Sequence, residues 1–165
     1  MRQATRIKSG ARTNRLESSV TVHLIKLCVG IEDVDHLVHV HRARIDAARA
    51  NGEPEVLRHV TRNTPRRAAE VLNGGSLYWV IKRIIAVRQP IIGLESVERE
   101  DGRPACAILL SDRYIRTVPR RSRAFQGWRY FPAEDAPADL GHGPASIKKD
   151  LPPEMAAELR ELGLL

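Results

Sequence analysis

Apolar positions recur with strand spacing along most of this chain and with helix spacing in three segments. Residues 20–30, VTVHLIKLCVG, are apolar and β-branched and predict a first strand that ends at Gly30. Asp33 then suits a helix N-cap, and the apolar residues after it fall on one helical stripe that ends at Gly52. The next apolar segment, LRHVTR, predicts a short second strand over residues 57–62.

The segment NTPRRAAEVLNGG, residues 63–75, carries the start and stop signals of a second helix. Thr64 suits the N-cap position, Pro65 suits the first helical position, and Gly74 and Gly75 follow the predicted end. These signals predict a compact helix that begins next to Thr64.

Extended patterns dominate the second half of the chain. Residues 76–97 predict two strands with a break near Pro90 and Gly93, and the Asp101-Gly102 pair predicts a hairpin into a strand over 105–110. Residues 113–118 and 124–131 predict two more strands. Residues 152–163, PPEMAAELRELG, predict a last helix that docks through Met155, Leu159 and Leu162. This order predicts an α+β fold with a mostly antiparallel, barrel-like sheet and short helices at its start, middle and C-terminus.

Length and composition indicate one globular domain. Residues 1–19 have no apolar period and predict a disordered basic tail, so we expect a single domain over residues 20–165. No apolar run approaches the roughly 18 to 20 residues that cross a bilayer, and no export signal is present. The two cysteines lie in apolar contexts typical of buried free thiols. We therefore expect a cytoplasmic protein with no membrane partner.

The net charge of +7 is concentrated in the middle of the chain. Residues 58–131 hold 15 Lys and Arg against 6 acidic residues, and the same segment contains all seven Phe, Trp and Tyr. Concentrated positive charge attracts polyanions, of which nucleic-acid backbones are the commonest large class. The alternative is that the arginines only keep exposed strand faces soluble.

Four of the seven aromatic residues fall in RAFQGWRYF, residues 123–131. If this segment is a strand, Phe125 and Phe131 share one face, and Trp128 and Tyr130 share the other. We expect the two Phe side chains to lie in the core. Trp128 either joins the core or forms an exposed platform for base stacking.

The TPRR segment suggests an anion site. Arg66 and Arg67 fall in the first turn of the predicted helix, where the helix dipole disfavours cations. A phosphate or carboxylate held there with Arg62 and Thr64 would reverse that cost. The alternative is pairing of these arginines with an internal acid such as Glu70.

Catalytic signatures give little support to an enzyme. The sequence shows no Gly-x-Ser-x-Gly elbow, no phosphate-binding Gly-rich loop and no His-Glu-x-x-His zinc helix. His36, His39 and His41 lack metal-ligand spacing, because His41 points away from His39 on a helix. We therefore assign no catalytic residue, no metal site and no cofactor.

Several blocks together resemble a known family. They are HLIKLCVG, RHVTRNTPRR, GGSLYWVIK, VRQPI and RAFQGWRYFPAEDAPADL. With them in view, the chain resembles the bacterial family called domain of unknown function 1489 from about Val20 to its end, a likeness that implies no activity. The order of elements is also similar to PUA-like domains, small β pseudo-barrels that bind RNA or modified bases, although a fold does not fix a function.

These observations lead to a prediction of non-enzymatic RNA binding, or binding of another single-stranded nucleic acid. The residues expected to carry it are Arg62, Thr64, Arg66, Arg67, Arg121, Arg123, Trp128 and Arg129. Two alternatives stay open: an enzyme acting on a small anionic or nucleotide substrate, and a subunit whose basic surface docks an acidic protein of unknown identity.

Overall fold

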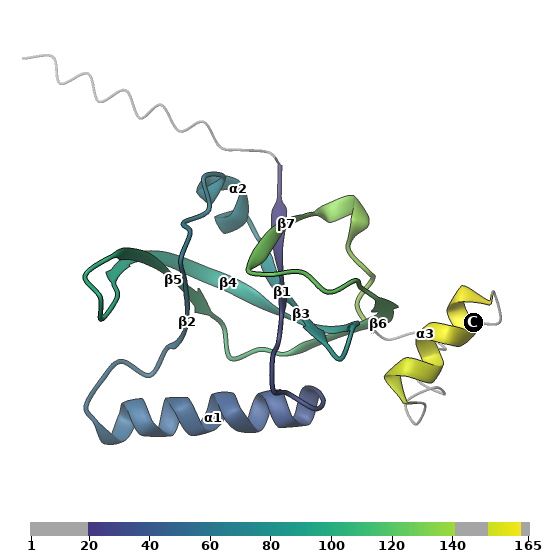
Figure 1. Ribbon diagram of the computed structural model, residues 1–165, viewed down its shortest axis with the longest axis horizontal. Helices are drawn as coiled ribbons and strands as arrows, with labels where there is room; N and C mark the ends of the chain where they lie inside the picture. The colour runs from purple at the N-terminus through teal and green to yellow at the C-terminus, as the bar shows by residue number, and fades with distance from the viewer. Residues whose placement is uncertain (1–19, 141–151, 163–165) are drawn as a thin grey trace, which may run out of the picture.

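A seven-stranded, mostly antiparallel sheet with few helices makes up the computed structural model of the protein (Figure 1). The structure describes residues 20–140 and 152–162, so the predicted tail over 1–19 lies outside the described residues. The strands are β1 (Val22–Leu27), β2 (Leu57–Thr61), β3 (Ser76–Ile81), β4 (Ile84–Glu98), β5 (Pro104–Leu110), β6 (Ile115–Arg121) and β7 (Trp128–Pro132). The helices are α1 (Val34–Ala50), α2 (Ala68–Leu72), α3 (Pro153–Glu161) and the 3-10 turn η1 (Ala133–Asp135).

The sheet is open, which corrects the expectation of a barrel. Its order is β2-β5-β4-β3-β1-β7, with β6 paired to β4 beside this path. Among the described strand pairs, β1 and β3 are parallel, and the segment that connects them contains α1, β2 and α2. The other pairs are antiparallel. β2 and β7 stand at the two ends of the order, and no backbone ladder joins them. The mixed α/β class is confirmed, whereas the closed barrel is wrong.

Strand β4 runs through the point where a break was expected. Its first half pairs with β3 and β6, and its second half pairs with β5. Pro90 lies at the change of partner, where its carbonyl accepts a hydrogen bond from Ser111 N at 2.9 Å. The register shifts between Ile91 and Gly93, and a Cβ on Gly93 would lie only 3.0 Å from a Leu109 methyl carbon. The Pro and Gly therefore mark a bulge in one strand.

The actual turn between β3 and β4 is Lys82-Arg83. Ile81 pairs with Ile84, so these two residues alone form the loop. Both have positive φ, 48° and 68°, the arrangement of a type I′ hairpin turn. Such turns favour Asn-Gly, because residues with a longer side chain are strained there. The sequence therefore gave no turn signal at this position.

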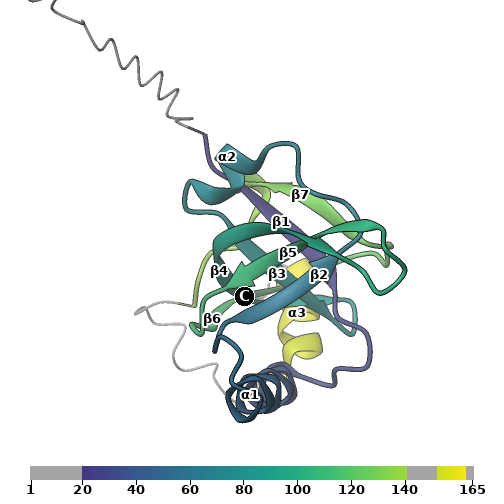
Figure 2. The same ribbon diagram turned by 90° about the vertical axis from the view of Figure 1, so that its left-hand side faces the viewer.

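The main core lies on one face of the sheet, beneath α1. Val34 and Leu37 of α1 pack there against Leu24, Leu77 and other buried apolar residues of the strands. Helix α1 begins as expected, with the Asp33 carboxylate accepting a hydrogen bond from His36 N at 2.7 Å. Figure 2 shows α1 end-on at the bottom of the view, with β7 near the top.

A smaller core occupies the other face of the sheet. Its buried residues are Ile25, Tyr78, Val80, Ile85 and Phe131, and Phe125 packs against them. Trp128 and Tyr130 pack instead against the main core. The expected division of the four aromatic side chains between two faces is therefore confirmed, although β7 begins only at Trp128.

Helix α3 docks differently from the expectation. Ala157 is its buried contact with the main core, whereas Met155 and Leu162 are 49% and 70% exposed. The side chain of Leu159 is outside the described residues. A small residue at the contact lets α3 lie close to the ends of β4 and β6, and its glutamates then lie beside those strands.

We predict that changing Lys82 to Asn together with Arg83 to Gly stabilises the fold. Both replacements adopt positive φ at less cost, so the free energy of unfolding should rise by about 1 kcal/mol. Denaturant midpoints measure the change. The control is Lys82→Ala with Arg83→Ala, which removes the same charges without relieving the backbone. Equal stabilisation of both variants would show that charge, and not turn conformation, limits stability.

Candidate nucleic-acid interface

The β3–β4 turn and the end of β6 form a basic cleft. Ile84 pairs with Arg121 in the sheet, and Ser122 N donates to the Arg83 carbonyl at 2.8 Å, so the two segments are held side by side. They enclose a cleft of about 550 Å³. It is lined by Lys82, Arg83, Ile84, Arg121, Ser122, Arg123, Glu154 and Glu158. This set is called the basic cleft below.

Two of its four cations are paired and two are not. Arg121 reaches α3, with Nη2 2.8 Å from Glu158 and Nε 3.7 Å from Glu161. Lys82 pairs with Glu32, and that hydrogen-bonded contact raises the pKa of Lys82. Arg83 and Arg123 are exposed and form no ion pair within residues 20–140 and 152–162. Arg83 and Arg123 are therefore the two cleft cations that remain available, while Glu32, Glu158 and Glu161 pair with the other two.

Arginine side chains cover two of the aromatic rings in this part of the molecule. The Cζ of Arg129 lies 4.8 Å from the centre of the Phe125 ring, and that of Arg120 lies 5.5 Å from the centre of Phe131. Cations over ring faces are favourable by about 0.5 to 1 kcal/mol at exposed sites. These contacts close the smaller core and keep guanidinium groups on its surface.

The predicted start of this helix at Thr64 is wrong, whereas the anion site expected there stays a prediction. Helix α2 has only five residues and begins at Ala68, with Arg67 as its N-cap. Pro65 is buried, and the N-cap residue Arg67 makes no side-chain capping hydrogen bond. Residues 64–67 therefore lie outside the helix. Gly75 packs directly against the end of α2, because a Cβ at this position would lie 2.1 Å from the Val71 carbonyl oxygen.

Arg67 is paired within the chain, which is the alternative to anion binding considered for this segment. Its guanidinium is paired with Glu70, and its Cζ lies 5.3 Å from the centre of the Tyr130 ring. Its backbone N–H donates to Tyr130 Oη at 3.1 Å. Arg62 and Arg66 are exposed and form no ion pair within the described part of the chain. The loop thus offers two available cations.

Trp128 fastens β7 to this loop. Its Nε1 donates to the Asn63 carbonyl at 3.0 Å, and its ring meets Tyr130 edge-on with centroids 5.0 Å apart. The side chain is half-buried against the main core. Trp128 and Arg129 lie on opposite faces of β7, so they do not form one surface.

The eight predicted site residues consequently lie in three places. Arg62, Thr64, Arg66, Arg67 and Trp128 gather at the β2–α2 loop. Arg121 and Arg123 line the basic cleft, and Arg129 lies over Phe125. Sequence reasoning missed Lys82 and Arg83, whose only sequence signal is a pair of cations between two apolar runs.

A comparison with protein-family models matches residues 24–165 to the family described as "Protein of unknown function (DUF1489)". The chain belongs to the DUF1489 family. The resemblance seen in the sequence is confirmed, while the likeness to PUA-like domains stays a prediction. No curated protein and no solved structure matches this DUF1489 chain. None of its helices within the described ranges is long and apolar enough to span a membrane.

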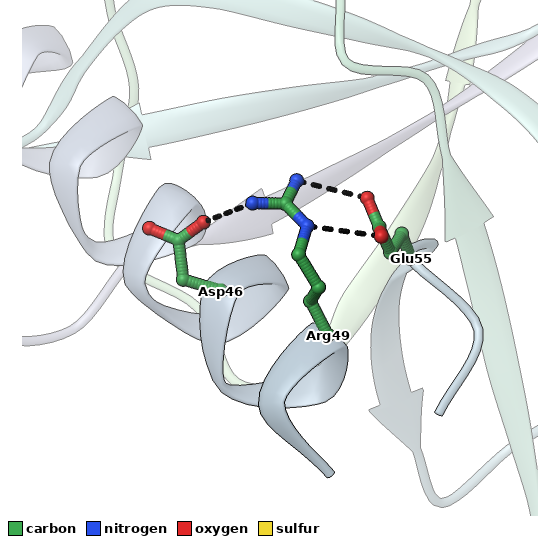
Figure 3. A network of polar contacts seen from close by, with 3 residues as sticks. All are labelled: Asp46, Arg49 and Glu55. Carbon is green, nitrogen blue, oxygen red and sulfur yellow. Dashed lines mark hydrogen bonds and ion pairs between the residues drawn. The ribbon is translucent and has the colours of Figure 1, made fainter. Parts of the chain in front are cut away.

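A second hollow of the DUF1489 protein, of about 510 Å³, lies beside α1. Arg49 at its rim is held between two carboxylates, 3.2 Å from Asp46 and 2.9 Å from Glu55 (Figure 3). The Glu55 contact is bidentate, through Nε and Nη2. Because these bonds join the end of α1 to the segment before β2, we assign Arg49 a structural role.

Buried polar groups connect this hollow to the main core. His41 Nδ1 and Tyr114 Oη are 3.0 Å apart at the hollow. Deeper in the core, Trp79 Nε1 donates to Gln89 Oε1 at 2.8 Å, and Gln89 Nε2 donates to the Ser111 carbonyl at 3.0 Å. These contacts fix Trp79 in the core with its polar atom satisfied.

Two histidines near Trp79 make the fold acid-sensitive. Burial lowers the pKa of His41 to about 4, and the nearby Arg44 adds to the effect. Burial also lowers the pKa of His59 to about 4, with contributions from Lys26, Arg44 and His41. Both histidines are therefore neutral in the folded protein at neutral pH.

We predict that stability falls as pH decreases from about 6.5 towards about 4. Over that range the unfolded chain, with ordinary histidine pKa values near 6.5, binds protons that the folded state excludes. Each histidine contributes at most about 1.4 kcal/mol per pH unit. The measurement is the free energy of unfolding at several pH values. His59→Gln should flatten the dependence of stability on pH, whereas His39→Gln, at an exposed position, should leave it unchanged. If the His59→Gln variant and the parent protein show the same dependence, His59 does not cause the loss of stability.

Proposed function

We propose that this DUF1489 protein binds RNA, or another single-stranded nucleic acid, through the basic cleft. The observation that carries the proposal is that Arg83 and Arg123, both exposed and without an ion pair among the described residues, line one cleft. Lys82 and Arg121 line it too, each paired with acidic side chains. Ion pairing with phosphates supplies most of the affinity in binding of this kind, and it requires clustered Lys and Arg without internal partners. Arg83 and Arg123 meet that requirement.

The strained turn supports this proposal. Positive φ at Lys82 and Arg83 is disfavoured by roughly 1 to 3 kcal/mol each, and strain of this kind clusters at functional sites. A relaxed Asn-Gly turn would remove both charges from the rim of the cleft. The presence of Lys82 and Arg83 at this strained turn thus favours a role in binding over a role in stability.

The aromatic residues favour contacts with phosphates over stacking with bases. Phe125, Tyr130 and Phe131 each have an arginine over the ring, and Trp128 is half-buried with its N–H already bonded. The covered rings therefore present arginine guanidinium groups, and not ring faces, to a ligand. Binding should then depend strongly on salt and little on base sequence.

We predict that Arg83→Ala combined with Arg123→Ala weakens binding to single-stranded RNA about tenfold or more at low salt. The salt slope should fall by up to about 1.4, near 0.7 for each lost phosphate contact. Titration of a labelled random RNA at three salt concentrations measures both quantities. Arg103→Ala, in the β4–β5 hairpin at the other end of the sheet (Figure 1), is the matched control. Equal losses in both variants, or no salt-dependent affinity of the parent, would exclude the proposal.

Helix α3 should limit that affinity. Glu158 is the nearer of the two acidic partners of Arg121, so Glu158→Gln leaves Arg121 only partly neutralised and should tighten RNA binding about two- to fivefold at low salt. The control, Glu95→Gln, removes the same charge from an ion pair with Arg58 elsewhere on the sheet. If both substitutions tighten binding equally, the effect comes from net charge and α3 does not compete with RNA.

A further inference from the structure

A lysine lies between two tryptophans on the inner face of the sheet. Lys26 of β1 pairs with Trp79 of β3 on one side and with Trp128 of β7 on the other. Paired residues of neighbouring strands direct their side chains to the same face. Because both tryptophans pack against the main core, Lys26 also points to that side, where it is half-buried.

The groups around Lys26 are basic. Burial lowers the pKa of His59, and the neighbouring Lys26 and Arg44 lower it further. Burial raises the pKa of the Cys28 thiol, and the same two cations oppose that effect. Within residues 20–140 and 152–162, neither Lys26 nor Arg44 forms an ion pair. These two cations, one from β1 and one from α1, therefore have no counter-charge among the described residues.

His59 adds a buried polar atom that is not satisfied. Its ring meets Trp79 edge-on, with centroids 5.2 Å apart and planes at 90°. Its Nε2 is buried and has no hydrogen-bond partner in the part of the chain that the structure describes. Leaving such an atom unpaired costs about 1 to 3 kcal/mol, and proteins rarely retain one without a role or a bound molecule.

Lys26 and His59 are neighbours of the same ring. Lys26 pairs in the sheet with Trp79, and the His59 ring meets the Trp79 ring edge-on. Strands β1 and β2, which carry Lys26 and His59, run upright in Figure 1 with α1 below them and α2 above. A group bound here would meet polar side chains from three elements.

We propose that Lys26, His59 and Arg44 form a binding site for a small oxyanion, the phosphate or carboxylate group of a small ligand. His59 Nε2 donates a hydrogen bond to it in the corresponding neutral tautomer, Lys26 supplies the charge, and the Arg44 guanidinium closes the site from α1. None of these residues belongs to the basic cleft, so this site is independent of the RNA proposal.

The test is titration with inorganic phosphate, a nucleoside 5′-monophosphate and acetate, followed by the histidine ring signals in NMR and by the melting temperature. Saturable shifts of His59 signals and a rise in melting temperature are expected, because a ligand of the folded state stabilises it. A response to acetate equal to that of phosphate would indicate a carboxylate ligand. A stronger response to the monophosphate would indicate a nucleotide.

Substitutions of Lys26 and Arg44 test whether these residues form the oxyanion site. Lys26→Met should abolish the response to phosphate, and Arg44→Ala, an exposed change that should not disturb folding, should weaken it several-fold. Lys82→Met in the basic cleft is the control and should retain it. Unchanged phosphate affinity in Arg44→Ala and Lys26→Met, or no shift of His59 in the parent, would overturn the proposal. If Lys26→Met does not fold, the Arg44→Ala result decides alone.

Discussion

The fold depends on one strand that serves two parts of the sheet. Strand β4 has 15 residues; its first half is hydrogen-bonded to β3 and β6, and its second half to β5. Close packing of Gly93 on Leu109, at the register shift, allows the change of partner within a continuous strand. As a result, the Lys82-Arg83 turn lies at one end of β4 and the Asp101-Gly102 hairpin at the other. The basic cleft exists because β6 returns along the first half of β4 and brings its arginines to that turn.

Arginine side chains that lie over aromatic rings contribute both to the packing of the fold and to the positive charge of its surface. Arg67, Arg120 and Arg129 lie over rings that close the two cores, so each contributes packing and also leaves charge at the surface. The stretch RAFQGWRYF is thus a loop that leads into strand β7, with Phe131 in the smaller core and arginines around it. A polyanion that binds such a rim meets groups already held in place, which lowers the conformational entropy lost on binding.

Local signals in the sequence predicted much of the fold. The Asp33 cap, the Asp101-Gly102 turn and the alternation around Trp128 gave α1, the β4–β5 hairpin and the two faces of β7, because each depends on neighbouring residues. The errors came from tertiary contacts. Burial of Pro65 displaced the start of α2, and the long pairing of β4 overrode Pro90 and Gly93. The cleft itself required knowing that β6 lies beside the β3–β4 turn, which no local pattern encodes.

Mapping of backbone amide shifts in NMR during titration with single-stranded RNA tests the central claim most directly. If the basic cleft binds nucleic acid, the largest shifts fall on residues 82–84 and 120–123, move together with one dissociation constant, and disappear as salt is added. Amides of the β4–β5 hairpin around residues 99–103 should remain unchanged. Shifts confined to that hairpin, or spread evenly over every exposed arginine, would contradict a specific role for the cleft.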